Sequence, residues 1–110
     1  MDIQFCEKLY NENMSKRKLA SIRKRIRKKS PKLNLFLVTL PLGEDGVLEI
    51  YWYPELLQKA YQELERDLYV VGVANDREDA FELIRTIVED AGITNGTISI
   101  KEFFKENSWC

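Results

Sequence analysis

The sequence predicts an α+β domain in which helices pack on a mixed four-stranded sheet. A chain of 110 residues that is 45% hydrophobic can form one domain with its own core, without disulfides or metal. Apolar runs typical of strands occur at 33–42, 47–53 and 67–74. Apolar residues at helical spacing occur at 16–29 and 75–92. Strands followed by helical segments indicate a sheet covered by helices.

The N-terminal segment is predicted to be helical. A short helix is expected over 2–10, where Phe5 and Leu9 have i, i+4 spacing. A second helix is expected over about 16–29, with Ser15 as its N-cap, and it ends before Pro31. Its apolar residues lie within about 60° of arc, a narrow stripe made of Leu19, Ile22 and Ile26.

The next two strands are predicted to form an antiparallel hairpin. The run 33–42 is almost continuously apolar, which is typical of a strand buried on both faces. A turn signal at Asp45–Gly46 follows, and the return strand 47–53 alternates between its two faces. A proline then opens a predicted helix over 54–64.

The C-terminal part is predicted to be strand, helix and strand. The run 67–74 is apolar on both faces, as in a central strand. The helix over 75–92 begins at an Asn75 or Asp76 cap and ends at Gly92. Its broad buried face is expected to comprise Ala80, Phe81, Ile84, Ile87, Val88 and Ala91. A half-exposed strand over 98–104 ends the order, which differs from the βαββαβ order of ferredoxin-like folds.

Two segments resemble small uncharacterised cytosolic α/β proteins of anaerobic Gram-positive bacteria. They are "LEIYWYPELL" and "LYVVGVANDREDAFELIRTIVEDAG", within residues 48–92. The phrase "GVANDREDAFELI", which joins a strand to a helix, is the most similar part. The resemblance implies no established activity and carries over no catalytic residue.

Charge divides the single domain, 1–110, into a basic helical segment, 1–30, and an acidic α/β core, 33–110. Residues 1–32 hold eleven Lys or Arg and three acids, a balance of +8. The remaining residues hold six basic and fifteen acidic residues, a balance of −9, so the whole chain carries −1. Such asymmetry indicates a charged partner, or two halves that partner each other.

The basic helix 16–29 is the candidate binding surface, because nine of its fourteen residues are Lys or Arg. The candidate residues for nucleic-acid or partner binding are Arg23, Lys24, Arg27 and Lys28, with Lys16 and Arg17 beside them. Exposed, they would neutralise phosphates of a nucleic acid. Alternatively, the charges are solvated or paired with acids of the same fold, of a homodimer or of a protein partner. Membrane binding is disfavoured because the apolar stripe is narrow and lacks Trp or Phe.

A second candidate is an aromatic sheet face made of Tyr51, Tyr53 and Tyr69, which alternate out of the predicted strands. On an open face they would stack bases or a partner's side chains. The more common arrangement is a face covered by the N-terminal helices or buried in a homodimer.

The composition favours a non-catalytic protein. The chain has no histidine, which removes the commonest general base and metal ligand. The acidic clusters match no metal or catalytic spacing, so no catalytic residue, metal, cofactor or small-molecule substrate is expected. Cys6 and Cys110 lack CxxC spacing and are expected to be free thiols in a reducing cytoplasm. They would form a disulfide only if the two ends of the chain meet.

Overall fold

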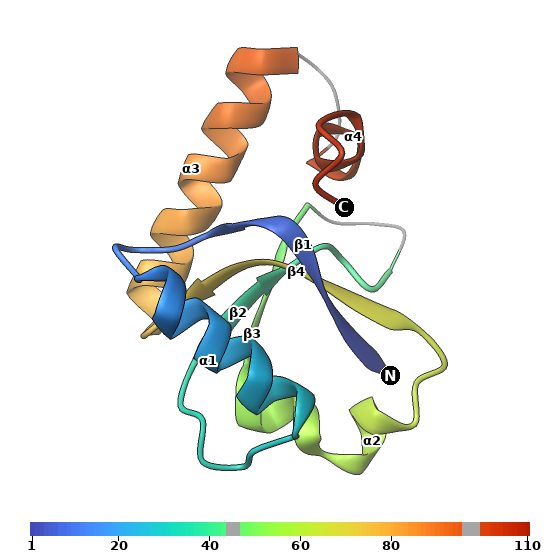
Figure 1. Ribbon diagram of the computed structural model, residues 1–110. Coiled ribbons are helices and arrows are strands. Elements are labelled where there is room, and N and C mark those ends of the chain that lie inside the picture. Colours follow the sequence, from blue (N-terminus) through green and yellow to red (C-terminus); the bar gives the residue numbers. More distant parts are fainter. Residues whose placement is uncertain (44–46, 96–99) are drawn as a thin grey trace.

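The computed structural model describes residues 1–43, 47–95 and 100–110, and it contains a four-stranded mixed sheet and helices, an α+β fold (Figure 1). The strands are β1 (Asp2–Tyr10), β2 (Phe36–Thr39), β3 (Glu49–Trp52) and β4 (Asp67–Ala74). The helices are α1 (Lys16–Arg27), α2 (Lys59–Gln62), α3 (Arg77–Asn95) and α4 (Ile100–Glu106), with a 3-10 helix η1 (Tyr53–Leu57). The predicted fold class is therefore confirmed.

The strand order in the sheet is β1-β4-β2-β3. Strands β2 and β3 form the predicted antiparallel hairpin, with Phe36 opposite Trp52 and Thr39 opposite Glu49; the predicted Asp45–Gly46 turn lies outside the described residues. Strand β4 is antiparallel to β2 and parallel to β1. The central strands are thus β2 and β4, the two whose sequences are apolar on both faces.

Helices cover both faces of the sheet. On one face, α1 and η1 pack on a core that includes Ile26, Leu56 and Val70. On the other face, α3 and α4 pack on a second core that includes Val71 and Phe104. Figure 1 shows α1 in the lower half of the view and α3 and α4 in the upper half. The sheet therefore separates α1 from α3.

The predicted helix over 2–10 is wrong, because this segment is strand β1, an edge strand parallel to β4. Exposed Asp2 and Gln4 alternate with half-buried Ile3 and Phe5. The i, i+4 spacing of Phe5 and Leu9 places both on one face of a helix, but also on one face of a strand. The segment is a strand and not a helix because it pairs with β4, which is distant in sequence.

The predicted strand over 98–104 is also wrong where the structure describes it. Residues 98–99 lie outside the described part, and helix α4 begins at Ile100. Ile100, Phe103 and Phe104 are buried, and their i, i+3, i+4 spacing is that of a helix face.

The order of elements also differs from the predicted one. The predicted helix over 54–64 divides into η1 and α2. With β1 as a strand, the chain through β4 has the βαββαβ order that the sequence was expected to lack. Gly92 does not end α3, which runs to Asn95.

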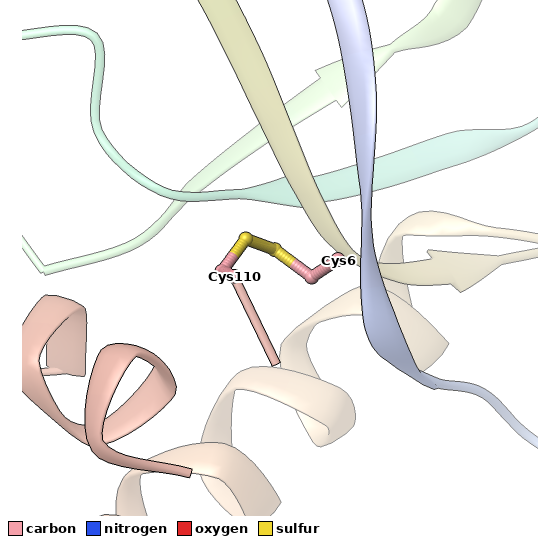
Figure 2. Close-up of a disulfide and its surroundings, with 2 residues drawn as sticks. All are labelled: Cys6 and Cys110. Atoms are coloured by element: carbon pink, nitrogen blue, oxygen red, sulfur yellow. A yellow bond between two sulfur atoms is a disulfide. The ribbon is translucent and has the colours of Figure 1, made fainter. Parts of the chain in front are cut away.

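The expectation of two free thiols is wrong, because Cys6 and Cys110 form a disulfide with a Cα–Cα distance of 4.6 Å (Figure 2). The backbone N–H of Glu7 donates to the Trp109 carbonyl at 2.6 Å. The Lys8 ammonium nitrogen also lies 4.5 Å from the centroid of the Trp109 ring. The C-terminal tail therefore lies along β1. A contact between residues 104 apart in sequence could not be foreseen from local patterns.

The predicted Ser15 cap is confirmed, and its loss gives a direct stability test. The Ser15 Oγ accepts from the Lys18 backbone N–H at 3.1 Å. Ser15→Ala leaves this N–H of the first turn without its protein partner, so we expect the free energy of unfolding to fall by about 1 kcal/mol. Urea denaturation followed by circular dichroism measures the change. Ser15→Asp, which keeps a capping oxygen, is the matched control and is expected to lose less.

Candidate nucleic-acid interface

Helix α1 is seated on the sheet by the stripe that its sequence predicts. Ile22 and Ile26 are 5% and 3% exposed, and Leu19 is half-buried against the same core. The stripe fixes which side of the helix meets the domain. Every other position of α1 is exposed except Arg23, which is half-buried.

We call the six basic candidate residues the basic surface of α1; they are Lys16, Arg17, Arg23, Lys24 and Arg27 of the helix and Lys28, its C-cap. At about 100° per residue, all six fall on one arc of roughly 140° on one side of the apolar stripe. All are exposed apart from half-buried Arg23. Lys18 and Arg25 lie on the other flank of the helix. The structure thus gathers the six predicted residues on one continuous face.

The basic surface is not neutralised by the rest of the described chain. Among described residues, no carboxylate lies within 4.0 Å of a basic side chain of α1. The Arg23 guanidinium lies 5.5 Å from the centroid of the Phe5 ring, which holds it against β1. Lys18, on the other flank, places its Nζ 3.5 Å from Asn75 Oδ1. Ion pairs between the basic residues of α1 and acids of the same fold, one alternative that the sequence left open, are therefore absent among the described residues.

Part of the charge pattern of α1 is unfavourable for the helix itself, although the last-turn cations Lys24, Arg25 and Arg27 suit the helix dipole. Arg23 and Arg27, and likewise Lys24 and Lys28, are like charges at i, i+4 positions, and such a pair costs roughly 0.2–0.5 kcal/mol. The first turn contains basic residues and no acid, although the positive end of the helix dipole favours acids. Local rules are broken most often where function requires it, so this surface is a candidate binding site.

Much of the acidic charge lies across the sheet. The described acids of α3 are Glu78, Asp79, Glu82, Glu89 and Asp90, and α3 packs on the face opposite α1. Three of them are already engaged: Glu82 and Glu89 pair with Arg85, and Asp90 accepts from the Tyr10 hydroxyl at 2.8 Å. A polyanion that approaches α1 is therefore separated from these carboxylates by the sheet.

The three tyrosines do not form a common face. Tyr53 is fully buried, and Tyr51 is half-buried against the core under α1. Tyr69 is 42% exposed and lies between Leu68 and Val70, which pack under α1, so its side chain projects from the opposite face. Strand β2 also separates β3, which carries Tyr51, from β4, which carries Tyr69. The three tyrosines therefore do not share an open stacking face, and Tyr51 and Tyr53 lie on the face covered by α1, which is the more common arrangement.

Two of these tyrosine hydroxyls have contrasting environments. The Tyr51 hydroxyl donates to Glu49 Oε1 at 3.1 Å, and burial together with this carboxylate raises the pKa of Tyr51 above its usual range. The Tyr53 hydroxyl is buried and has no hydrogen-bond partner in the described chain. A buried polar group left in this state costs about 1–3 kcal/mol.

Sequence reasoning missed a hollow of about 170 Å³ that Tyr53 helps to line. It lies between the end of α1, the start of β1 and the η1–α2 segment, and its lining includes Ile26 and Arg27 of α1. Three segments distant in sequence meet there, so no local pattern indicates it. The sequence offers one indirect indication of this site: the basic residues continue beyond the helix to Lys29, which also lines the hollow.

Other kinds of site are not found in the part of the chain that the structure describes. That part contains no group of three potential metal-ligating His, Cys, Asp or Glu side chains. Within the same residues, no helix has the length and apolarity needed to cross a membrane. Comparison with known proteins gives no match to a family model, a curated protein or a solved structure.

Proposed function

We propose that the protein is a non-catalytic binding protein that associates with nucleic acid through the basic surface of α1. The observation that carries the proposal is the set of six cations gathered on one face with no carboxylate in ion-pair distance among the described residues. Lys and Arg bind phosphates and release counterions. A helix of 12 residues is about 18 Å long, which is enough to follow several phosphates of a strand.

The side chains of the basic surface favour backbone contacts over sequence reading. The helix carries no Asn or Gln, the residues that read adenine by two hydrogen bonds. Its arginines could contact guanine, so base reading is limited to that one base. Phosphate contacts position a protein without specifying sequence. The proposed activity is therefore general binding with a steep dependence on salt.

The salt dependence tests this proposal directly. We expect a labelled oligonucleotide of about 12 nucleotides to bind at about 50 mM salt, and the affinity to fall at least tenfold by about 200 mM. Fluorescence anisotropy at a series of salt concentrations measures both. An absence of binding at the lower salt would reject the function.

The alternative function is a protein-interaction module, in a homodimer or with another protein. It is favoured by α3, where Phe81 and Val88 are 56% and 44% exposed, although both were expected in its buried face. The two are seven residues apart, so they share one side of the helix. Exposed apolar residues that are grouped in this way are typical of contact sites.

Phe81→Asp separates this alternative from nucleic-acid binding. If α3 forms a dimer, the substitution is expected to convert a concentration-dependent dimer into a monomer, which analytical ultracentrifugation measures. Thr86→Asp, an exposed position about 140° around the same helix from Phe81, is the control. A wild-type monomer at all concentrations would exclude the homodimer.

The cytoplasmic location is part of the same proposal. Disulfides persist mainly in oxidising compartments, so the Cys6–Cys110 disulfide of the structure weighs against this part of the proposal. Alkylation of thiols at cell lysis, followed by mass spectrometry, tests the location, because a protein held in a reducing cytoplasm would yield both residues alkylated. An intact disulfide would place the protein elsewhere.

A further inference from the structure

The hollow at the end of α1 combines three kinds of chemistry. Ile3, Ile26 and Leu57 contribute apolar side chains from three different segments, and Arg27 and Lys29 contribute positive charge. Tyr53, which also lines the hollow, adds the third kind, a hydroxyl that is buried beside it. A bare phosphate would leave the apolar wall unused, whereas a purely apolar ligand would leave the two cations without a partner. A ligand with a flat apolar part and an attached anion matches both.

The Tyr53 hydroxyl supports a ligand with polar edges. Tyr53 lines the hollow, and its hydroxyl has no hydrogen-bond partner in the described chain. Burial raises the pKa of Tyr53, so the group stays protonated. Because the hydroxyl is fully buried, it donates to a ligand only after a small shift of the side chains around it. Asp2 also lines the hollow and would accept from an N–H group of a base, such as the ring N–H of thymine. The ring nitrogens and exocyclic groups of a nucleobase offer partners of both kinds.

The hollow is continuous with the basic surface, because Arg27 belongs to both. A strand that follows α1 toward its C-terminal end would bring a nucleotide to this hollow. Its phosphate would meet Arg27 and Lys29, while its base would lie against the half-buried Ile3 and Leu57. Proteins that bind single strands commonly combine such a charged track with contacts to the bases.

We propose that this hollow receives one unpaired base of a single-stranded nucleic acid whose phosphates follow the basic surface. The inference rests on the proposed function and deepens it, since it selects single strands over duplexes. In a duplex the bases are stacked and paired, so none is free to enter.

The test compares two strands that carry the same phosphates. One is an oligothymidine strand of about 12 nucleotides, and the other is a fully abasic strand of the same length. The intact strand is expected to bind about tenfold more tightly than the abasic strand, which corresponds to one sequestered base. Fluorescence anisotropy with the full chain at about 50 mM salt measures both affinities.

Two variants locate the base. Tyr53→Phe removes only the unpartnered hydroxyl, and it is expected to weaken binding of the intact strand about five- to tenfold. Leu57→Trp adds bulk in the hollow and is expected to lower the affinity for the intact strand to that for the abasic strand. Neither change should alter binding of the abasic strand. Tyr61→Phe is the matched control, because Tyr61 is not part of the lining and its hydroxyl donates to Glu55.

The outcomes separate this inference from the proposed function. Equal affinity for intact and abasic strands, unchanged in Tyr53→Phe, would overturn the base pocket and leave backbone binding in place. Absence of binding to either strand would reject the proposed function, and the pocket with it. Circular dichroism of each variant shows that the fold is retained, and Tyr53→Phe keeps the test open if Leu57→Trp does not fold.

Discussion

Replacing Cys110 with serine is expected to lower the free energy of unfolding by about 3–5 kcal/mol relative to the disulfide-bonded protein. The disulfide joins residues separated by 104 positions, so it closes almost the whole chain into one loop. In the chain-entropy account, a cross-link of this span restricts the unfolded chain by about 4.7 kcal/mol. Urea denaturation of the oxidised protein and of Cys110→Ser measures the difference.

The remaining contacts of the tail predict that the variant still folds. Trp109 packs edge-on against Phe103 and Phe104, with ring centroids 5.4 and 5.8 Å apart, and its carbonyl accepts from the Glu7 N–H. These contacts do not depend on the sulfur atoms. We therefore expect helix α4 to remain docked, with native circular dichroism at 25 °C.

Chemical reduction provides the control for this substitution. Wild-type protein treated with a reducing agent should unfold at the same urea concentration as Cys110→Ser. The variant itself should be insensitive to the same treatment. If oxidised and reduced wild-type protein have equal midpoints, the disulfide contributes nothing to stability.

The elements that could be predicted from the sequence are those whose pattern is determined locally. Helix α1 shows its period in Ile22 and Ile26, both buried as expected. Strands β2 and β4 are apolar on both faces, and both are central. The spacing of apolar residues along a helix or strand shows which of its sides meets the core, regardless of which element packs on that side.

The elements that could not be predicted depend on distant partners. Strand β1 exists because β4 supplies its hydrogen bonds. Helix α4 and the Cys6–Cys110 pair require the end of the chain to return beside β1. The candidate site likewise has one part that the local sequence predicts and one part that it does not. The basic surface follows from the residues of α1 alone, whereas the hollow next to Arg27 forms only when three segments meet.

Changing Arg23, Lys24, Arg27 and Lys28 together to glutamine is expected to abolish most nucleic-acid binding. Each phosphate contact on a single strand contributes about 0.7 to the slope of log affinity against log salt, so losing four should reduce the slope by about 3. At about 50 mM salt the affinity should fall by at least tenfold. Anisotropy titrations at several salt concentrations give the slope and the affinity.

A matched variant distinguishes a local surface from net charge. Lys59, Arg66, Lys101 and Lys105 are four exposed basic residues outside α1, and changing them to glutamine alters the net charge equally. Binding through α1 predicts that this control keeps most of the salt slope. Equal losses in the two variants would show that only the overall charge matters.

The same four substitutions in α1 should leave the fold intact, because the replaced side chains do not belong to the buried stripe. They remove the repulsion between Arg23 and Arg27 and between Lys24 and Lys28, but also the favourable last-turn charges of Lys24 and Arg27 and the contact of Arg23 with Phe5. These effects oppose each other, so stability should change by no more than about 1 kcal/mol. A variant of nearly unchanged stability that no longer binds would mean that this charge density is maintained for a polyanion. A variant destabilised by more than this would mean instead that these side chains support the fold, and the basic surface would lose its assignment as a binding site.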